Sequence, residues 1–560
     1  MKKIILLYWF VLFFTLIFTR FYKLNEYPPH LTIDEVSIGY NAYSILKTGM
    51  DEWGEFMPIS FRSVGDYKAP TLIYLTVPFI KFFGLNEWGV RLPVAIFSCI
   101  SVLLFWYLVK KFIFKDKSSY LAYISTFIFA FSPWLIVYSR SGYEAVVAQT
   151  FMLANIIFAF KLKETKKISD FFWMVIFAYL SAVTYHSTKM VVPLLNIYFV
   201  LSNKKILIES VVDWSKKEKF KLIILCTILV AITIFFVTNF IFGSGSSRAK
   251  MTFLTKDFEF ARVLLPEFEK NPYSVFTSII GFFSFWYKRY LDYFSPNFYL
   301  FSGLGLATPG YPAQGVIYAV EYLFFIIGFC GIVFKDNKLK EYFSDKYFGN
   351  FLLVWFMVGL LPASLTNNAQ HSLRTLNLLP VLSIVISLGI AFIFKKIKHS
   401  TLFLCAFFAI IILGYSLGVT RFLDYYLLHY PVELSENRSF GWKQVSLYAN
   451  AHHQEYQLVY VDSRFGTEGQ YIYGVPYLYL LFYSQYDPLT YIQGRKTFRG
   501  TNFENYVFTD INWYGMDHSQ NNLYISSPWS IPVTTSKKTN IKLYVPFLNN
   551  KSGLYVVSDQ

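Results

Sequence analysis

The chain has 560 residues, of which 55% are hydrophobic, 21% aromatic and only 15% charged. Soluble domains carry charge on roughly a quarter of their residues, so this composition excludes an ordinary soluble protein and indicates a polytopic membrane protein. The net charge of +16 could suit a nucleic-acid partner, but the lysines stand in short clusters between apolar runs rather than on one basic face, which membrane topology explains better.

The N-terminus predicts a first membrane span. Met1-Lys2-Lys3 and the apolar run that follows, Ile4 to Thr19, have the basic and apolar regions of a signal peptide. A cleavage site with small residues is absent, since Arg20-Phe21-Tyr22 comes next. We therefore expect this segment to remain as an uncleaved helix.

Apolar runs of a length that can cross the bilayer recur along the chain up to Thr420. A helix needs about 20 such residues to cross about 30 Å of hydrocarbon, and irregular backbone cannot face lipid. We predict about eleven spans by hydropathy, at residues 4–20, 89–110, 119–138, 145–161, 170–185, 188–201, 220–242, 316–334, 348–365, 374–394 and 400–420.

Lysine clusters set the predicted orientation. They fall at residues 2–3, 110–117, 161–167, 204–221, 335–346 and 395–398, and the positive-inside rule places such clusters in the cytoplasm. The run Ala69 to Gly84 decides the predicted topology, because a membrane crossing there would move every later lysine cluster to the outside. It is short and contains Pro78 and Lys81, so we predict an interfacial helix on the outer surface.

The segment after Arg421 is polar and rich in tyrosine. Residues 458–462, 542–547 and 553–557 are typical of strands, and residues 475–483 of a helix or strand. We predict a transmembrane domain at residues 1–420 and a small extracytoplasmic α/β or α+β domain at residues 421–560.

On this topology the acids and cations that stand out share the outer side. Acids there could accept a proton from a hydroxyl, and the cations could hold a phosphate at headgroup depth. Transfer of a sugar from a lipid phosphate needs both kinds of group. The candidates are Asp34, Glu35, Lys68, Arg140, Glu144, His186, Lys189, Arg248, His371 and Arg374.

Each candidate also has a structural explanation. Asp34 could cap a helix, and Glu35 could complete the cap or a salt bridge. The cations near span ends, Arg91 included, could anchor helices at the headgroups, and Arg140 with Glu144 could form an i,i+4 pair. The clustered acids allow a divalent metal ion, but the His and Cys spacing of a strong metal site is absent.

An ordered set of short segments resembles the GT-C membrane glycosyltransferases of the protein O-mannosyltransferase and aminoarabinose-transferase kind. The set covers roughly the first 400 residues, at residues 34–35, 67–70, 84–93, 132–144, 184–193 and 371–380. The resemblance implies an inverting transferase that uses a polyprenyl-phosphate sugar on the outer face, with a glycan, glycolipid or protein as acceptor.

By this resemblance Asp34 would be the catalytic base or an acid that positions the acceptor, with Glu35 beside it, and Lys68 would contact the donor phosphate. Glu144 stands where relatives carry a second acid, and His371 and Arg374 would add phosphate contacts. Relatives often have Lys-Pro-Pro where this chain has Lys68-Ala69-Pro70, which leaves the backbone geometry there open.

Two other classes of function stay open at this stage. A transporter or lipid flippase would place ionisable groups near the midplane of broken, repeated helices, whereas these spans are almost free of charge and show no repeat. A structural or sensor protein would use the C-terminal segment to bind a partner. The abundance of Lys, Ile, Phe and Asn suggests a bacterial source, and hence the plasma membrane, with the N-terminus in the cytoplasm.

Overall fold

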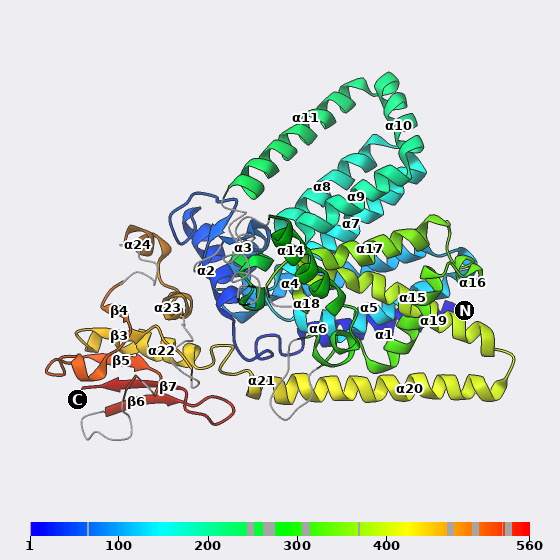
Figure 1. The fold of residues 1–560 in the computed structure, drawn as a ribbon. Coiled ribbons are helices and arrows are strands. Elements are labelled where there is room, and N and C mark those ends of the chain that lie inside the picture. Colours follow the sequence, from blue (N-terminus) through cyan, green and yellow to red (C-terminus); the bar gives the residue numbers. More distant parts are fainter. Residues whose placement is uncertain are drawn as a thin grey trace. The chain divides into compact units, whose positions relative to one another are not determined.

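A computed structural model gives the fold of the chain (Figure 1). The structure describes residues 2–63, 67–243, 251–260, 262, 275–304, 314–367, 370–466, 475–494, 503–528, 530–531 and 540–559. The chain divides into two compact units. The helical unit comprises Met1–Arg20, Ile96–Ser139 and Tyr143–Phe422, and the mixed unit comprises Phe21–Ala95, Arg140–Gly142 and Leu423–Gln560.

Helices make up most of the described part of the helical unit, and most of them are apolar. They are α1 (Lys2–Phe21), α4 (Glu87–Leu108), α5 (Tyr120–Phe131), α6 (Pro133–Ser139), α7 (Glu144–Thr165), α8 (Ile168–Thr184), α9 (Thr188–Ser202), α10 (Lys204–Lys217), α11 (Lys219–Phe236), α14 (Val275–Asp292), α15 (Ala319–Val333), α16 (Asn337–Lys340), α17 (Tyr347–Ser364), α18 (Ser372–Thr375), α19 (Leu379–Ile397) and α20 (Thr401–Asp424).

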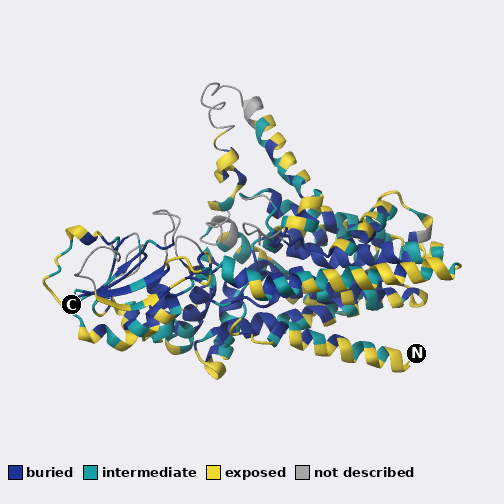
Figure 2. Cartoon of the chain, turned by 90° about the horizontal axis from the view of Figure 1, so that it is seen from below, coloured by how far each residue is buried: buried dark blue, intermediate teal, exposed yellow. Residues whose placement is uncertain are grey.

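Among the described residues, seven helices are long and apolar enough to cross a membrane, or nine if two bent pairs each count as one span. Many large apolar side chains on α1, α11 and α20 are exposed, and Figure 2 shows such positions in yellow on the helix that carries the N-terminus. Exposed apolar helix faces of this length require lipid around them. The chain is a multi-pass membrane protein.

A helix lies at every one of the predicted spans, and two of these helices differ in form from a single helix of span length. The span at residues 119–138 is broken into α5 and α6, which bend by 50°, because Pro133 has no N–H for the helix ladder. The helix at the last predicted span is longer than the span: helical structure continues past residue 420, through the end of α20 and two short helical segments, to Glu433. The number of crossings stays a prediction.

The mixed unit joins the first loop to the C-terminal segment. Its helices are α2 (Ile33–Thr48), α3 (Pro70–Phe83), α21 (Tyr430–Glu433), α22 (Trp442–His452), α23 (Pro476–Ser484) and α24 (Pro488–Gln493). The strands are β1 (Phe61–Arg62), β2 (Tyr67–Lys68), β3 (Val459–Asp462), β4 (Tyr506–Thr509), β5 (Leu523–Ser526), β6 (Asn540–Val545) and β7 (Leu554–Ser558).

The C-terminal strands form a five-stranded sheet in the order β4-β3-β5-β7-β6. β3 pairs in parallel with β4 and β5, whereas β7 runs antiparallel to β5 and β6. Helix α22 packs on β6 and β7, as Figure 1 shows, and Trp513, Tyr524 and Val557 form part of a separate apolar cluster. A small mixed α/β domain is therefore confirmed, and residues 475–483 are helical rather than extended.

The mixed unit also groups segments that the predicted domain boundary separates. Residues 21–95 cluster with residues 423–560, and α2 packs on α3, α23 and α24. The apolar run at residues 69–84 forms α3, whose 14 residues are too few to span about 30 Å as a single helix.

Two glycines allow close packing inside the helical unit. A Cβ atom at Gly389 of α19 would lie 2.0 Å from the carbonyl oxygen of Phe324, and one at Gly328 of α15 would lie 2.1 Å from that of Val385. Both obstacles are backbone atoms, which cannot rotate away. Membrane helices commonly use small residues for this purpose.

We therefore expect Gly389→Ala to lower the thermal denaturation midpoint of the detergent-purified protein, because overpacking a core costs about 1–3 kcal/mol. Gly349→Ala in α17 is the matched control, since its Cβ atom would meet its nearest neighbours at 3.9 Å. The control is expected to be neutral or slightly stabilising, because alanine is the better helix former. Equal midpoints for the two variants would contradict the packing account.

Candidate functional site

The paired acids begin helix α2 but have different environments. Thr32 is the N-cap: its hydroxyl accepts the N–H of Glu35 at 3.3 Å, and the Glu35 carboxylate accepts the N–H of Thr32 at 2.9 Å. This capping box fixes Glu35, whose side chain is fully buried. The Asp34 side chain is 48% exposed and forms an ion pair with Lys68.

Lys68 reaches Asp34 from the short hairpin β1–β2. Phe61 pairs with Lys68 in this hairpin, and Pro70 follows at the start of α3. The Lys68 side chain is only 3% exposed. The hairpin therefore places a nearly buried ammonium group against a carboxylate that solvent can reach.

Glu35 is the centre of a buried network. Its second carboxylate oxygen accepts Nε of Arg91 at 2.9 Å and the backbone N–H of Gly142 at 3.0 Å. Both members of the ion pair are fully buried. Glu35 thus connects the start of α2 to α4 and to the segment 140–142.

Arg91 uses its remaining donors on the loop that precedes α2. One terminal nitrogen donates to the carbonyl oxygens of Leu24 at 2.9 Å and Pro28 at 2.8 Å, and the other donates to His30 at 2.6 Å. Sequence reasoning assigned Arg91 to headgroup anchoring. The structure buries it completely instead.

Arg140 acts on the same loop. A terminal nitrogen donates to the carbonyl oxygens of Tyr22 at 2.7 Å and Tyr27 at 3.1 Å, and the residue is 3% exposed. Two buried arginines thus satisfy backbone carbonyls of residues 22–30, which would otherwise be costly to bury. Arg140 therefore has a structural function in the mixed unit.

Burial and charge shift two ionisation equilibria here. Burial alone would raise the pKa of the Glu35 carboxyl, but the charges of Arg91 and Arg438, with hydrogen bonds from Thr32 and Arg91, hold that pKa below its usual value. Burial and the charges of Arg91, Lys443 and Arg438 lower the pKa of His30 to about 3. Glu35 is therefore ionised and His30 neutral at pH 7.

The C-terminal segment supports the same helices. The Tyr479 hydroxyl of α23 donates to the carbonyl oxygen of Leu31 at 3.1 Å, just before α2. Glu87, at the start of α4, accepts Lys443 at 2.8 Å and the Tyr483 hydroxyl at 3.2 Å. Sequence reasoning missed these residues, because about 400 positions separate the partners and no local pattern marks them.

The other predicted site residues belong to the helical unit. Glu144 begins α7, and His186 Nδ1 lies 3.2 Å from Lys189 Nζ in the turn between α8 and α9. The His371 N–H donates to the Tyr293 hydroxyl at 3.0 Å, and Arg374 donates to Thr366 Oγ1 at 2.6 Å. Arg248 lies outside the described residues.

The structure thus brings Asp34, Glu35, Lys68 and Arg140 together in one unit, whereas His186, Lys189, His371 and Arg374 belong to the other, where His186 lies against Lys189. In the described part of the chain, no group of three or more His, Cys, Asp or Glu side chains is placed to hold a metal ion.

Comparisons with known proteins bear on this arrangement. The family described as dolichyl-phosphate-mannose-protein mannosyltransferase matches residues 67–215, a segment that begins beside Lys68 and does not include Asp34. The crystal structure of ArnT from Cupriavidus metallidurans bound to undecaprenyl phosphate matches with a TM-score of 0.53 and 12% identity, over 100% of this chain and 98% of ArnT. This chain has the ArnT fold.

The expected resemblance to the GT-C glycosyltransferases is therefore confirmed at the level of fold. The oligosaccharyltransferase AglB from Archaeoglobus fulgidus, in complex with an inhibitory peptide and a dolichol-phosphate, also matches, with 11% identity and a TM-score of 0.45 over 86% of this chain and 63% of AglB. No curated protein sequence matches the chain.

The buried Glu35–Arg91 pair yields a stability prediction. Glu35→Gln leaves the Arg91 charge buried without its partner, which costs about 3–5 kcal/mol. Glu26→Gln is the matched control, because it makes the same change in an ion pair with Lys23 whose side chains are 46% and 51% exposed, worth about 0–1 kcal/mol. Chemical denaturation of the purified proteins would measure the free energy of unfolding of both variants. Equal decreases would show that the buried pair stabilises the fold no more than the exposed pair does.

His30 yields a prediction about pH. Its pKa of about 3 in the folded state lies below the ordinary value of 6.5, so the unfolded chain binds a proton that the folded chain excludes. The free energy of unfolding that the lowered pKa of His30 contributes is fully present above pH 6.5. It decreases as the pH falls through 6 and 5. His30→Asn is expected to flatten this decrease in denaturation midpoints. His452→Asn, at a side chain 38% exposed, should leave it unchanged, and a profile insensitive to His30→Asn would refute the assignment.

Proposed function

We propose that this chain is a glycosyltransferase that moves a sugar from a polyprenyl-phosphate donor to an acceptor hydroxyl on the outer face of the membrane. The main support is the position of Asp34 in the first turn of α2, where its accessible carboxylate is held by an ion pair with the nearly buried Lys68. The ArnT fold and the match of residues 67–215 to a mannosyltransferase family support the proposal.

In the proposed reaction Asp34 is the general base. The acceptor hydroxyl gives its proton to the Asp34 carboxylate while its oxygen forms a bond to the anomeric carbon of the sugar. The bond between that carbon and the phosphate oxygen breaks, and the polyprenyl phosphate leaves with the electron pair. Attack opposite the leaving group inverts the anomeric configuration.

Lys68 has two roles in this proposal. Its ion pair with Asp34 orients the carboxylate, and an ammonium group has three N–H donors, so the same group can also approach the donor phosphate. Cations stabilise the charge that develops on a departing phosphate. We assign further phosphate contacts to His186, Lys189, Arg248, His371 and Arg374, and an acceptor contact to Glu144.

The proposal assigns a purely structural role to Glu35 and Arg140. The Glu35 carboxylate accepts donors from Thr32, Arg91 and Gly142, and Arg140 donates to backbone carbonyls. The Glu35 side chain is fully buried, and Arg140 is held against the backbone of residues 22–27, so we assign substrate contact to neither. We propose these structural roles in place of the catalytic role that the sequence predicted for Glu35 and the substrate-binding role that it predicted for Arg140.

The composition of the mixed unit supports the proposed sidedness. Residues 21–95, 140–142 and 423–560 cluster into one compact unit, which agrees with a common side of the membrane for the three segments. The lysine clusters favour the outer side for all three segments and the cytoplasm for the N-terminus. We place the protein in a bacterial plasma membrane, with the C-terminal domain outside.

Asp34→Asn is expected to reduce transfer by about 10²–10⁴-fold, the usual contribution of a general base. Proteoliposomes containing the protein would receive undecaprenyl-phosphate hexoses as donors and a cell-envelope extract as acceptor. Mass spectrometry would measure the undecaprenyl phosphate released and the glycosylated product.

Glu26→Gln serves as the control, since it removes an exposed acid of the same unit that also pairs with a lysine. It should keep wild-type rates. Undiminished transfer by Asp34→Asn would overturn the catalytic role, and uptake of donor without any product in the wild type would favour a transporter.

A further inference from the structure

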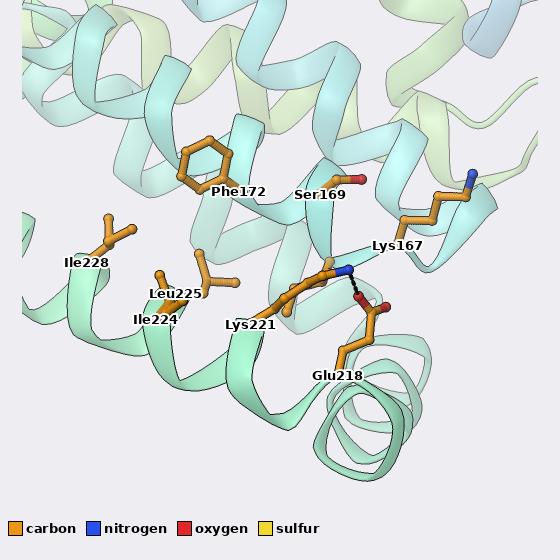
Figure 3. Close-up of a pocket in the computed structure, with 9 residues that line it drawn as sticks. Lys167, Ser169, Phe172, Glu218, Lys221, Ile224, Leu225 and Ile228 are labelled. Carbon is orange, nitrogen blue, oxygen red and sulfur yellow. Dashed lines mark hydrogen bonds and ion pairs between the residues drawn. The ribbon is translucent and has the colours of Figure 1, made fainter.

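A groove lies between α8 and α11 in the helical unit. Its volume is about 530 Å³, within the range of sites that hold small molecules. In Figure 3 the side chains of Phe172 and Leu225 face the space between the two helices, whereas the Lys167 side chain extends away from Lys221. The lining residues include Lys167, Ile168, Phe172, Lys221, Leu225 and Ile228.

Polar and apolar groups are separated along the groove. Lys167 immediately precedes α8, and Lys221 and Glu218 stand at the start of α11. The apolar residues Phe172, Leu225 and Ile228 follow along the two helices (Figure 3). A charged opening followed by an apolar channel suits a molecule with a charged head and a hydrocarbon chain.

Helix α11 leaves this channel accessible to lipid. Leu225 is the one buried residue in α11, and Ile223, Ile224, Val230 and Ile234 are exposed. A helix so weakly packed on its neighbours exposes its apolar surface to acyl chains. The groove is therefore an opening in the protein wall that faces the bilayer.

Helix α10 indicates the depth of the opening. It turns by 86° from α9, has lysines at both ends, and exposes Ile208, Val211 and Val212. A basic helix with exposed apolar residues lies in the interface plane. Trp214 of α10 donates to the carbonyl oxygen of Lys166 at 2.8 Å, so α10 and the start of α8 lie at the same level.

We propose that this groove binds one anionic phospholipid, with its phosphate held by Lys167 and Lys221 and one acyl chain between α8 and α11. The local charge favours an anion, because lysines 161, 163, 166, 167, 216, 217, 219 and 221 outnumber the acids 164, 170, 209, 213 and 218. Glu218 binds Lys221 at 2.6 Å in this structure, and the phosphate replaces that carboxylate as its partner.

The test is a titration of the full-length protein in detergent with palmitoyl-oleoyl phosphatidylglycerol, followed by native mass spectrometry. The wild type is expected to bind one molecule in preference to the phosphatidylcholine of the same chains. Lys167→Gln/Lys221→Gln should weaken binding about 30-fold, which corresponds to about 2 kcal/mol, or about 1 kcal/mol for each lysine near a lipid headgroup.

The matched control is Lys216→Gln/Lys219→Gln, which removes the same charge from exposed lysines of the same cluster that do not line the groove. It should change binding by less than about threefold if the contacts are specific. Glu218→Gln should tighten binding, because it releases Lys221. Ile228→Trp should weaken binding of both lipids by filling the channel.

If the two double variants weakened lipid binding equally, the effect would be a general attraction between the lysine cluster and anionic lipid, and the proposal would be overturned. Equal binding of the two lipids by the wild type would overturn the headgroup contacts. Unchanged binding by Ile228→Trp would place the lipid elsewhere. Melting curves of each variant would show that the loss is not caused by unfolding.

Discussion

The buried ion pair between Glu35 and Arg91 is the interaction on which the candidate site depends. One carboxylate closes the cap of α2, binds α4 through Arg91 and binds the segment 140–142 through Gly142. Breaking one partner of such a pair leaves a charge without compensation in a medium of low dielectric. The first turn of α2 is therefore held firmly, and Asp34 is placed on its accessible side.

The C-terminal segment contributes to this rigidity from far along the chain. Its helix α23 packs on α2, and its tyrosines and Lys443 bind residues at the starts of α2 and α4. A reactive carboxylate needs a supporting shell that fixes its position. The C-terminal segment thus acts as a support for the proposed reaction site, in addition to any contact with an acceptor.

The sequence predicted the parts of the fold that local patterns encode. Apolar runs of span length became helices, and alternating residues near the C-terminus became strands, because each pattern depends on near neighbours. The bend at Pro133 and the continuation of the last helix to Glu433 were not predicted, although the missing N–H of Pro133 is a local signal for the bend. The role of Arg91 was missed, since its acceptors are the carbonyls of residues 24, 28 and 30, which sequence cannot bring together. The sequence suggested that Glu35 could complete a cap or a salt bridge, and the structure confirms both contacts. The full burial of Glu35 and the exposure of Asp34 were not predicted, because they depend on distant segments.

The central claim is that the base and the phosphate-binding cations share the outer aqueous phase. Labelling by a membrane-impermeant maleimide in intact cells tests it most directly, with single cysteines at positions 34 and 374 in a background from which the four native cysteines are removed. The account predicts that Asp34→Cys and Arg374→Cys are both labelled from outside. Labelling of one from outside and of the other only after permeabilisation would contradict it.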